Sequence, residues 1–262
     1  MGTFSGKCAL ISGGGTGIGA AAARRMARDG ANVVIMGRRQ AQLKEVAHAI
    51  GAEIFVGDAA DPQQADAAIK QTVERFGGLD IVVANAGGHG FATIAETTDE
   101  DWEASRRANL DTAVILLRAA MPELIRSKGA IAVTASIASL AAPASAFGYT
   151  VAKHAQIGLV RSIARDFGRF GVRCNAVCPG WVTSEMADGE MDELRVRMNL
   201  SSREEAYALV TRDVPLGRPA SPDEVAAAIA FLCSSEAAMI TGAILTVDGG
   251  STVVDVPTLS FS

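Results

Sequence analysis

The stretch Lys7-Cys8-Ala9-Leu10-Ile11-Ser12-Gly13-Gly14-Gly15-Thr16-Gly17-Ile18-Gly19 decides the fold of this chain. Residues 7–12 form an apolar run typical of a short buried strand, and small and apolar residues recur at helical spacing over 17–29. Glycines in the turn between them permit a tight bend, close approach of a pyrophosphate to the backbone, and close packing of helix on strand. The spacing is G-x-x-x-G-x-G rather than G-x-G-x-x-G. Because a strand precedes the turn and a helix follows it, a phosphate-binding turn is favoured over a merely flexible one.

Strands and helices alternate along the rest of the chain, which is typical of a parallel sheet with helices on both faces. The expected further strands are 31–36, 53–56, 79–84, 130–134, 172–178 and 243–247, and the expected further helices are 40–50, 62–76, 98–125, 147–170 and 222–233. Asp61 and Ser221, each followed by proline, are expected to cap helices. We therefore predict an α/β, doubly wound Rossmann fold with a seven-stranded parallel sheet. Ligands of such a sheet bind beyond the carboxyl ends of its strands.

Tyr149 and Lys153 stand four residues apart in the expected helix 147–170, and Ser136 follows the strand 130–134. Residues i and i+4 share one face of a helix. A free phenol has a pKa of about 10, and a nearby ammonium stabilises the phenolate and lowers that pKa. Ser136 could give a substrate oxygen a second hydrogen bond. An isolated Y-x-x-x-K is more commonly a surface tyrosine and a solvated lysine, so the glycine turn is what favours a proton-exchanging pair.

The order of the motifs resembles that of the short-chain dehydrogenase/reductase family, in its single-domain branch, over essentially the whole chain. The matching segments are Ser12–Gly19, Asp58, Asn85-Ala86-Gly87-Gly88, Asn109, Ser136, Tyr149, Lys153, Pro179-Gly180-Trp181-Val182-Thr183, Thr241-Gly242 and Val247-Asp248-Gly249-Gly250. The resemblance implies hydride transfer between nicotinamide C4 and a ketone carbon, with Tyr149 as the acid or base. It implies the catalytic set Asn109, Ser136, Tyr149 and Lys153. In that set Lys153 also binds the nicotinamide ribose, and Asn109 supports a water leading from Lys153 to solvent.

The end of the second strand bears on the choice of nucleotide. Enzymes that prefer NAD usually have an acidic residue there, which binds the ribose 2′-hydroxyl, whereas this chain reads Met36-Gly37-Arg38-Arg39. A guanidinium fork suits a 2′-phosphate, so we predict NADP(H). NAD(H) is the alternative, because no basic residue in the glycine turn reinforces the prediction.

The resemblance also implies how the nucleotide is held. Asp58 would accept from the adenine amino group, unless it is only a loop residue before the cap at Asp61. Asn85 and the small residues after it would shape the adenosine-ribose side, and Thr183 would hold the carboxamide. The predicted cofactor-binding residues are Ser12, Gly13, Gly15, Thr16, Gly17, Ile18, Gly19, Arg38, Arg39, Asp58, Ala59, Asn85, Ala86, Gly87, Tyr149, Lys153, Pro179, Gly180, Val182 and Thr183.

The substrate side is less clear from the sequence. We expect a lid of one or two mobile helices at about 183–214. Its methionines at 186, 191 and 198, with Trp181, suggest an apolar, adaptable wall, so the expected substrate is a small to medium apolar ketone or secondary alcohol. A solvent-exposed position is expected for His89 in the loop 88–91. The apolar tail 251–262 is expected to fold over a neighbouring subunit, and the resemblance implies a homotetramer, or a dimer, built through the two long helices.

Length and composition fit one dinucleotide-binding catalytic domain over residues 1–262. The chain has 49% hydrophobic and 20% charged residues, and no linker or repeat divides it. A net charge of -5 without a basic patch argues against a nucleic-acid partner. No apolar run approaches the roughly 20 residues that span a bilayer, and no signal peptide is evident, so we expect a cytoplasmic protein without a membrane partner. The cysteines Cys8, Cys174, Cys178 and Cys233 are expected to be free, buried thiols, and no metal site is expected.

Three functions compete at this point. The first is an NADP(H)-dependent carbonyl reductase or secondary alcohol dehydrogenase. Within the same class stand an NAD-dependent alcohol dehydrogenase and a 3-oxoacyl-thioester reductase, for which no basic docking patch is evident near the lid. The second is a non-catalytic nucleotide-sensing protein, which would have no need of a proton donor. The third is an isomerase, decarboxylase or lyase that uses the nucleotide transiently.

Overall fold

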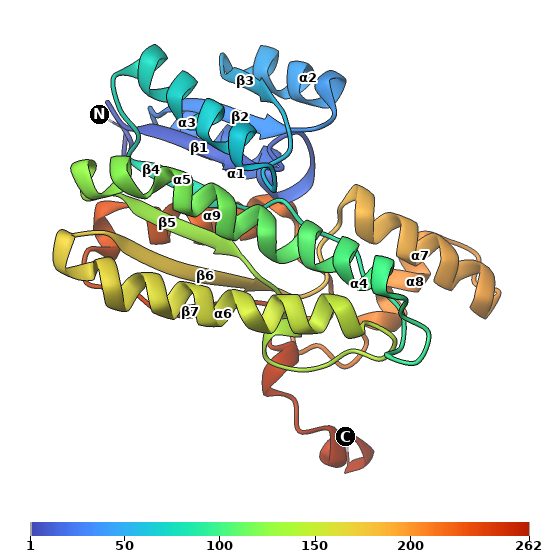
Figure 1. Ribbon diagram of the computed structural model, residues 1–262. Coiled ribbons are helices and arrows are strands. Elements are labelled where there is room, and N and C mark those ends of the chain that lie inside the picture. Colours follow the sequence, from blue (N-terminus) through green and yellow to red (C-terminus); the bar gives the residue numbers. More distant parts are fainter. Residues whose placement is uncertain (1, 262) are drawn as a thin grey trace.

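A seven-stranded sheet in the order β3-β2-β1-β4-β5-β6-β7 forms the centre of the computed structural model, which describes residues 2–261 (Figure 1). The strands are β1 Cys8–Ser12, β2 Asn32–Gly37, β3 Glu53–Val56, β4 Ile81–Ala84, β5 Ala130–Thr134, β6 Arg173–Pro179 and β7 Ile244–Val247. Every neighbouring pair is parallel. The predicted doubly wound fold is confirmed, and the strand order reverses at β1, between β2 and β4.

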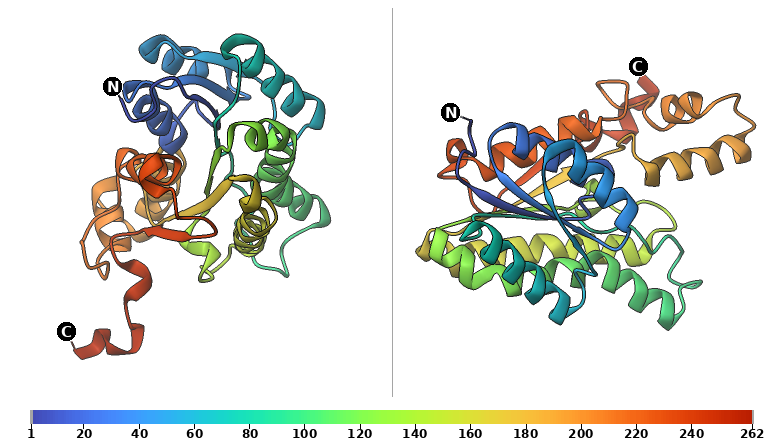
Figure 2. Two further views of the ribbon diagram at one scale, coloured as in Figure 1. Left: turned by 90° about the vertical axis from the view of Figure 1, so that its left-hand side faces the viewer. Right: turned by 90° about the horizontal axis from the view of Figure 1, so that it is seen from above.

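Helices cover both faces of this sheet (Figure 2). One face carries α3 (Pro62–Phe76), α5 (Thr112–Ser127) and α6 (Phe147–Phe167), and the other carries α1 (Gly17–Arg28), α2 (Gln40–Ile50) and α9 (Pro222–Cys233). The helix α4 (Asp99–Arg106) leads towards α5. The helices α7 (Glu185–Met198) and α8 (Arg203–Val210) project from the body of the molecule (Figure 1). Within residues 2–261, no helix has the length and apolarity to cross a membrane.

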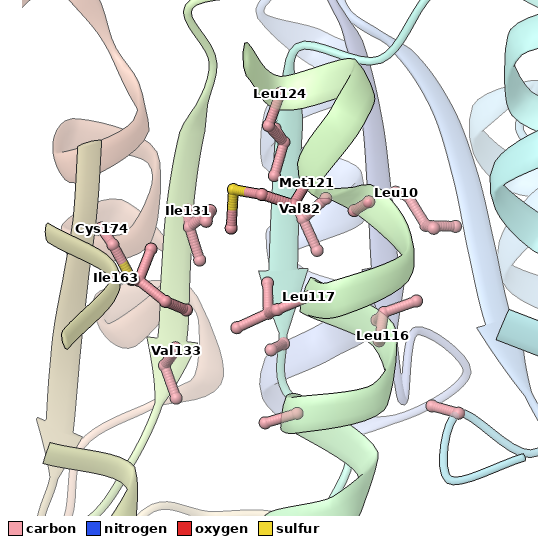
Figure 3. Packing of buried hydrophobic residues seen from close by; sticks show 14 of the residues in the cluster. Leu10, Val82, Leu116, Leu117, Met121, Leu124, Ile131, Val133, Ile163 and Cys174 are labelled. Carbon is pink, nitrogen blue, oxygen red and sulfur yellow. The ribbon is translucent and has the colours of Figure 1, made fainter. Parts of the chain in front are cut away.

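The side chains of the strands alternate between two apolar cores, as the twofold period of a strand requires. In β1, Leu10 belongs to the core beneath α3, α5 and α6, whereas Ala9 and Ile11 belong to the core beneath α1, α2 and α9. Figure 3 shows Leu117 and Met121 of α5 lying over the sheet at the first of these cores. Burial of a large apolar side chain contributes about 1.5–3 kcal/mol, so both faces hold the strands firmly and fix the loops at their carboxyl ends.

The predicted helix caps are confirmed. The Asp61 side chain accepts hydrogen bonds from the backbone N–H groups of Gln63 and Gln64. Ser221 and Glu224 form a reciprocal capping box at the start of α9. These signals could be recognised in the sequence because each depends on residues within one turn of helix.

The prediction of one continuous helix over 98–125 is wrong. Five residues with π-helical hydrogen bonding, Arg107–Asp111, separate α4 from α5. A π-turn inside an α-helix is rare, and such turns occur often at functional sites. In this π-turn, the side chain of Asn109 bonds to the loop after β4. The expected helix 147–170 also ends earlier, at Phe167, and continues as a 3-10 turn to Phe170.

The C-terminal segment leaves the body of the molecule after β7 (Figures 1 and 2). It consists of two short 3-10 turns, Ser251–Val253 and Val256–Phe261. Val253 and Val256 are 80% and 70% exposed. The tail therefore carries apolar side chains that the body of this chain does not cover.

Candidate active site

A cleft of about 1230 Å³ lies between the loops at the carboxyl ends of the strands and the start of α7. Ligand sites commonly measure about 300–1,000 Å³, so this cleft has room for a large ligand. The predicted residues that line it are Ser12, Gly13, Gly15, Thr16, Gly17, Ile18, Arg38, Arg39, Asp58, Ala59, Asn85, Ala86, Gly87, Ser136, Tyr149, Lys153, Pro179, Gly180 and Val182. Gly19, Asn109 and Thr183 do not line it. Gly19 and Asn109 are buried behind the wall, and Thr183 is exposed outside it.

The glycine turn is tied to the loop after β4. The Ser12 hydroxyl accepts hydrogen bonds from the backbone N–H groups of Asn85 (3.0 Å) and Ala86 (3.1 Å), and Asn85 Nδ2 donates to the Ser12 carbonyl at 3.2 Å. Gly13 has φ of +65°, and a Cβ on it would lie 2.8 Å from Asn85 Nδ2. A Cβ on Gly19 would overlap the Gly13 carbonyl. The turn thus presents bare backbone beside the N-terminus of α1, which fits a pyrophosphate.

The end of the cleft beyond β2 and β3 is rich in arginine. Arg38 is exposed and makes no hydrogen bond or ion pair within residues 2–261. Arg39 forms a bidentate pair with Glu185 of α7, both distances being 3.0 Å, and also donates to Thr16 Oγ1 at 3.1 Å. Arg39, unlike Arg38, is therefore already paired with a carboxylate, 146 residues away in the chain, which the sequence does not predict.

Asp58 lies at the same end of the cleft and is paired with Arg107 of the π-turn at 2.8 Å. It also accepts from the Ala60 N–H at 2.9 Å. Burial raises the pKa of Asp58, but the Ala60 hydrogen bond and the Arg107 guanidinium outweigh burial and hold that pKa below its ordinary value. Arg107 was not a predicted site residue, because it is 49 residues from Asp58 in the chain.

Lys153 lies at the inner wall of the cleft and is only 4% exposed. Its Nζ donates to the Thr134 carbonyl at 2.8 Å and to Gln156 Oε1 at 3.3 Å. Burial lowers the pKa of Lys153 to about 8, because an apolar setting disfavours the charged form. The Nζ atom is 5.6 Å from the centroid of the Tyr149 ring.

Tyr149 stands beside Lys153 with its ring against Phe91, the two ring centroids being 5.2 Å apart. Burial raises the pKa of Tyr149, hydrogen bonding by Ser136 partly opposes the rise, and the Glu190 carboxylate adds to it. The prediction that the pKa of Tyr149 is lowered in this site is therefore wrong for this structure. Burial discourages charge on both partners, and Lys153 gives its hydrogen bonds to Thr134 and Gln156 rather than to the phenol.

Asn109 sits in the π-turn and does not reach the cleft with its side chain. Its Oδ1 accepts from Gly88 N–H at 2.7 Å, and its Nδ2 donates to the His89 and Ser105 carbonyls at 3.0 and 2.9 Å. The backbone carbonyl of Asn109 accepts from Gln156 Nε2 at 2.6 Å. The Asn109 side chain therefore shapes the loop after β4. Its backbone carbonyl is connected to Lys153 through the side chain of Gln156.

The substrate side of the cleft is formed partly by α7. Met186 packs against Gly88, whereas Met191 is buried in a small core between α7 and α8, and Met198 is exposed away from the cleft. Glu190, one helical turn after Met186, lines the cleft, is half-buried, and forms no hydrogen bond or ion pair within the described chain. Burial and the neighbouring Glu193 raise the pKa of Glu190. The wall of the cleft formed by α7 is thus less apolar than expected. Glu190 was not predicted as a site residue because residues 183–214 show no strong periodicity.

The four cysteines are buried and free, as predicted. Burial raises the pKa of the thiols of Cys8, Cys174, Cys178 and Cys233. They contribute to packing as small apolar side chains.

The doubly wound fold and the cleft at its glycine turn are those of a dinucleotide-binding α/β protein, and comparison with known proteins identifies its family. A model described as Enoyl-(Acyl carrier protein) reductase, within the short-chain dehydrogenases, matches residues 13–252. The chain is 48% identical over 259 residues to Protein MoaE of Klebsiella aerogenes, covering 98% of this chain and 99% of that protein. It is 36% identical over 255 residues to meso-2,3-butanediol dehydrogenase of Serratia marcescens, covering 96% and 97%. The chain belongs to the short-chain dehydrogenase/reductase family.

The solved structures agree with this assignment. The ligand-free aldohexose dehydrogenase of Thermoplasma acidophilum superimposes with a TM-score of 0.87 at 30% identity, covering 97% of this chain and 96% of that one. The protein is therefore an oxidoreductase of this family that uses a nicotinamide nucleotide.

Proposed function

We propose that the protein is an NADP(H)-dependent carbonyl reductase or secondary alcohol dehydrogenase. The observation that carries the proposal is that Tyr149, Ser136 and Lys153 line the same cleft as the glycine turn. The nicotinamide, when bound, supplies or accepts a hydride at C4. Tyr149 donates a proton to the developing alkoxide in reduction and accepts it in oxidation, and Ser136 holds the same oxygen by a hydrogen bond. The raised pKa of Tyr149 keeps the phenol protonated at neutral pH, which suits the donor role in reduction.

We base the preference for NADP(H) on the arginines at the end of the cleft beyond β2 and β3, where the adenosine would bind. Arg38 is free to bind a 2′-phosphate, and Arg107 offsets the charge of Asp58 nearby. We expect Arg38→Ala to lower kcat/KM for NADP(H) by about 10–100-fold, the range for loss of a charge-assisted contact, and to leave kcat/KM for NAD(H) unchanged. An equal effect on both nucleotides would contradict the assignment of Arg38.

The substrate we propose is a small alcohol or ketone that carries a second hydroxyl group. Glu190 faces the cleft without a partner, and a half-buried carboxylate is stabilised by a hydrogen-bond donor. The names of butanediol dehydrogenase and aldohexose dehydrogenase also point to substrates with more than one hydroxyl group. A purely apolar ketone, as the sequence suggested, leaves Glu190 unsatisfied.

We further propose that residues 1–262 act as one domain in which α7 and α8 form a lid. The two helices share their own small core, which includes Met191 and Tyr207, and so can move as a unit. The contact of Met186 with Gly88 closes the lid over the substrate end of the cleft. A cytoplasmic location is in keeping with the four free thiols.

The test is absorbance of the reduced nicotinamide with each nucleotide and a panel of paired substrates, such as 2,3-butanediol with 2-butanol and acetoin with 2-butanone. We expect turnover with NADP(H), and a higher kcat/KM for the hydroxylated member of each pair. Turnover of 3-oxoacyl thioesters alone would favour the thioester reductase. Nucleotide binding without any turnover would favour a nucleotide-sensing protein, and conversion of substrate without a net absorbance change would favour an isomerase, decarboxylase or lyase.

A further inference from the structure

Gln156 is a polar residue in the buried face of α6, directly behind the catalytic pair. It is 1% exposed. Its Oε1 accepts from Lys153 Nζ at 3.3 Å, and its Nε2 donates to the backbone carbonyl of Asn109 at 2.6 Å. Both ends of the amide are therefore used, and they join α6 to the π-turn.

The hydrogen bonds of Lys153 leave it one free N–H. An ammonium has three N–H donors, of which one goes to the Thr134 carbonyl and one to Gln156. Gly87, at the wall of the cleft, lies next to the Nζ atom: a Cβ on Gly87 would be 3.6 Å from it. With two donors fixed behind it, Lys153 has its third donor free for a ligand in the cleft.

The acceptors around Lys153 are neutral. No carboxylate forms an ion pair with it within residues 2–261, and the titratable groups that face it are the Tyr149 phenol and the Cys178 thiol of β6. Two carboxylates act on those groups instead, Glu190 on Tyr149 and Asp248 on Cys178. A carboxylate in place of the amide would hold Lys153 charged and paired, whereas an amide orients it and leaves its charge uncompensated.

We propose that Gln156 is a positioning residue, which holds the Lys153 ammonium through a neutral acceptor and ties it to the backbone of the π-turn at Asn109. The proposal rests on the proposed function for its kinetic consequences only. Because an amide N–H is not acidic, Gln156 orients Lys153 but does not carry its proton onward. The connection between Asn109 and Lys153 that the family resemblance implied to run through water is made here by a side chain.

The first test is an NMR titration of the ligand-free protein labelled with ¹³C at lysine Cε. Lys153 is one of five lysines, and Lys153→Met assigns its signal. We expect the Lys153 signal of the parent to titrate near its pKa of about 8. In Gln156→Glu, which keeps the size of the side chain, we expect this midpoint to rise by one pH unit or more. Unchanged titration in Gln156→Glu would overturn the proposal.

The second test is the pH profile of kcat, with Gln156→Met as a variant of similar size that cannot hydrogen-bond. We expect the profile of Gln156→Glu to shift to higher pH, and kcat of Gln156→Met to fall about tenfold or more with little change in substrate KM. Gln71→Glu, which alters an amide of α3 bonded to the Ile54 carbonyl, is the matched control and should leave titration and profile unchanged. Parent-like pH profiles and kcat in both Gln156 variants would overturn the proposal. If the parent itself turns over no substrate, the proposed function fails, and the NMR titration still decides the role of Gln156.

Discussion

Tyr149 and Lys153 share an environment that disfavours charge on either of them. Burial raises the pKa of the phenol and lowers that of the ammonium. The ordinary pKa values are 10.0 for the phenol and 10.5 for the ammonium, so the two values move apart. The phenol becomes the weaker acid and the ammonium the stronger one, which keeps a proton on Tyr149. The i, i+4 spacing predicted that the two side chains are neighbours, but it could not predict these directions, because burial depends on what other elements cover the pair.

Replacement of the phenol tests its role directly. We expect Tyr149→Phe to bind NADP(H) with the parent affinity and to lose about 10²–10⁴-fold in kcat, the usual contribution of general acid–base catalysis. Tyr207→Phe is the matched control, because the only other tyrosine donates to Asp188 within the lid rather than to the cleft. The measurements are nucleotide titration and steady-state rates. Comparable rates for Tyr149→Phe and the parent would rule out its acid/base role.

The buried lysine also predicts how stability depends on pH. Its pKa is about 8 in the folded protein and 10.5 ordinarily, so between these pH values the unfolded chain binds a proton that the folded chain does not. Stability contributed by this group therefore rises with pH across that window. Over the whole window, the free energy of unfolding contributed by Lys153 rises by about 3 kcal/mol.

The comparison that isolates this effect is urea unfolding of the parent and of Lys153→Met at several pH values. We expect the free energy of unfolding of the parent, relative to the variant, to rise by about 3 kcal/mol from pH 8 to 10.5. The buried thiols of Cys8, Cys174 and Cys233, whose pKa values are raised and on which Lys153 has no effect, titrate in both proteins and cancel in the difference. Parallel pH dependences of the two proteins would show that Lys153 is not desolvated.

At the scale of elements, the sequence predicted what depends on neighbours in the chain and missed what depends on distant segments. The caps of α3 and α9 follow from residues within one turn. The interruption between α4 and α5 does not, because the π-turn is held by contacts of Asn109 with a loop 20 residues away. The same reason explains why Gln156 and Glu190 were not predicted: on a helix each is an ordinary polar residue until its partner or cavity is known.

The pair between Arg39 and Glu185 joins the start of α2 to the start of α7. Its side chains are largely exposed, so the pair adds little to stability. The pair occupies a guanidinium at the end of the cleft beyond β2 and β3, where we propose that the adenosine binds. The Glu185 carboxylate would therefore compete with a bound 2′-phosphate for Arg39.

Removal of that carboxylate should therefore tighten binding of the phosphorylated nucleotide. We expect Glu185→Gln to lower the Kd for NADP(H) by about 3–10-fold, a gain of the size of one charged contact, with the Kd for NAD(H) unchanged. Calorimetric titration of both nucleotides measures this, and Glu204→Gln in α8, whose carboxylate bonds locally near Ser202, is the control. Equal changes for both nucleotides would mean that Glu185 acts on the lid and not through Arg39.

At the scale of the whole molecule, the sheet order brings the parts of the site together. The strand order reverses at β1, so the glycine turn after β1 and the loop after β4 lie side by side and are joined by Ser12 and Asn85. The α6 helix carries Tyr149 to the same end of the sheet. These placements could be predicted because the fold class dictates them. Helices at about 183–214 on the substrate side were expected too, but their contacts, such as that of Glu185 with Arg39, could not be predicted.

The outer surface of the molecule bears on self-association. On α6, Val151 is exposed, and Gly158 has no atom within 4 Å of the place a Cβ would take. The C-terminal tail carries further exposed valines. We propose that a second copy of the chain covers the outer face of α6, as in the homotetramer or dimer that the family resemblance implied.

A substitution at Gly158 tests this arrangement. In a monomer, Gly158→Arg meets open space and removes a helix-destabilising glycine, so the free energy of unfolding should rise by up to about 1 kcal/mol. In an oligomer packed through α6, the added side chain and charge would fall within the interface, and sizing chromatography should show a smaller particle. We expect the second result, with loss of the parent assembly. Gly189→Arg is the matched control, because Gly189 is also helical and also open but lies in α7. Dissociation by both variants, or by neither, would place the contact elsewhere than on α6.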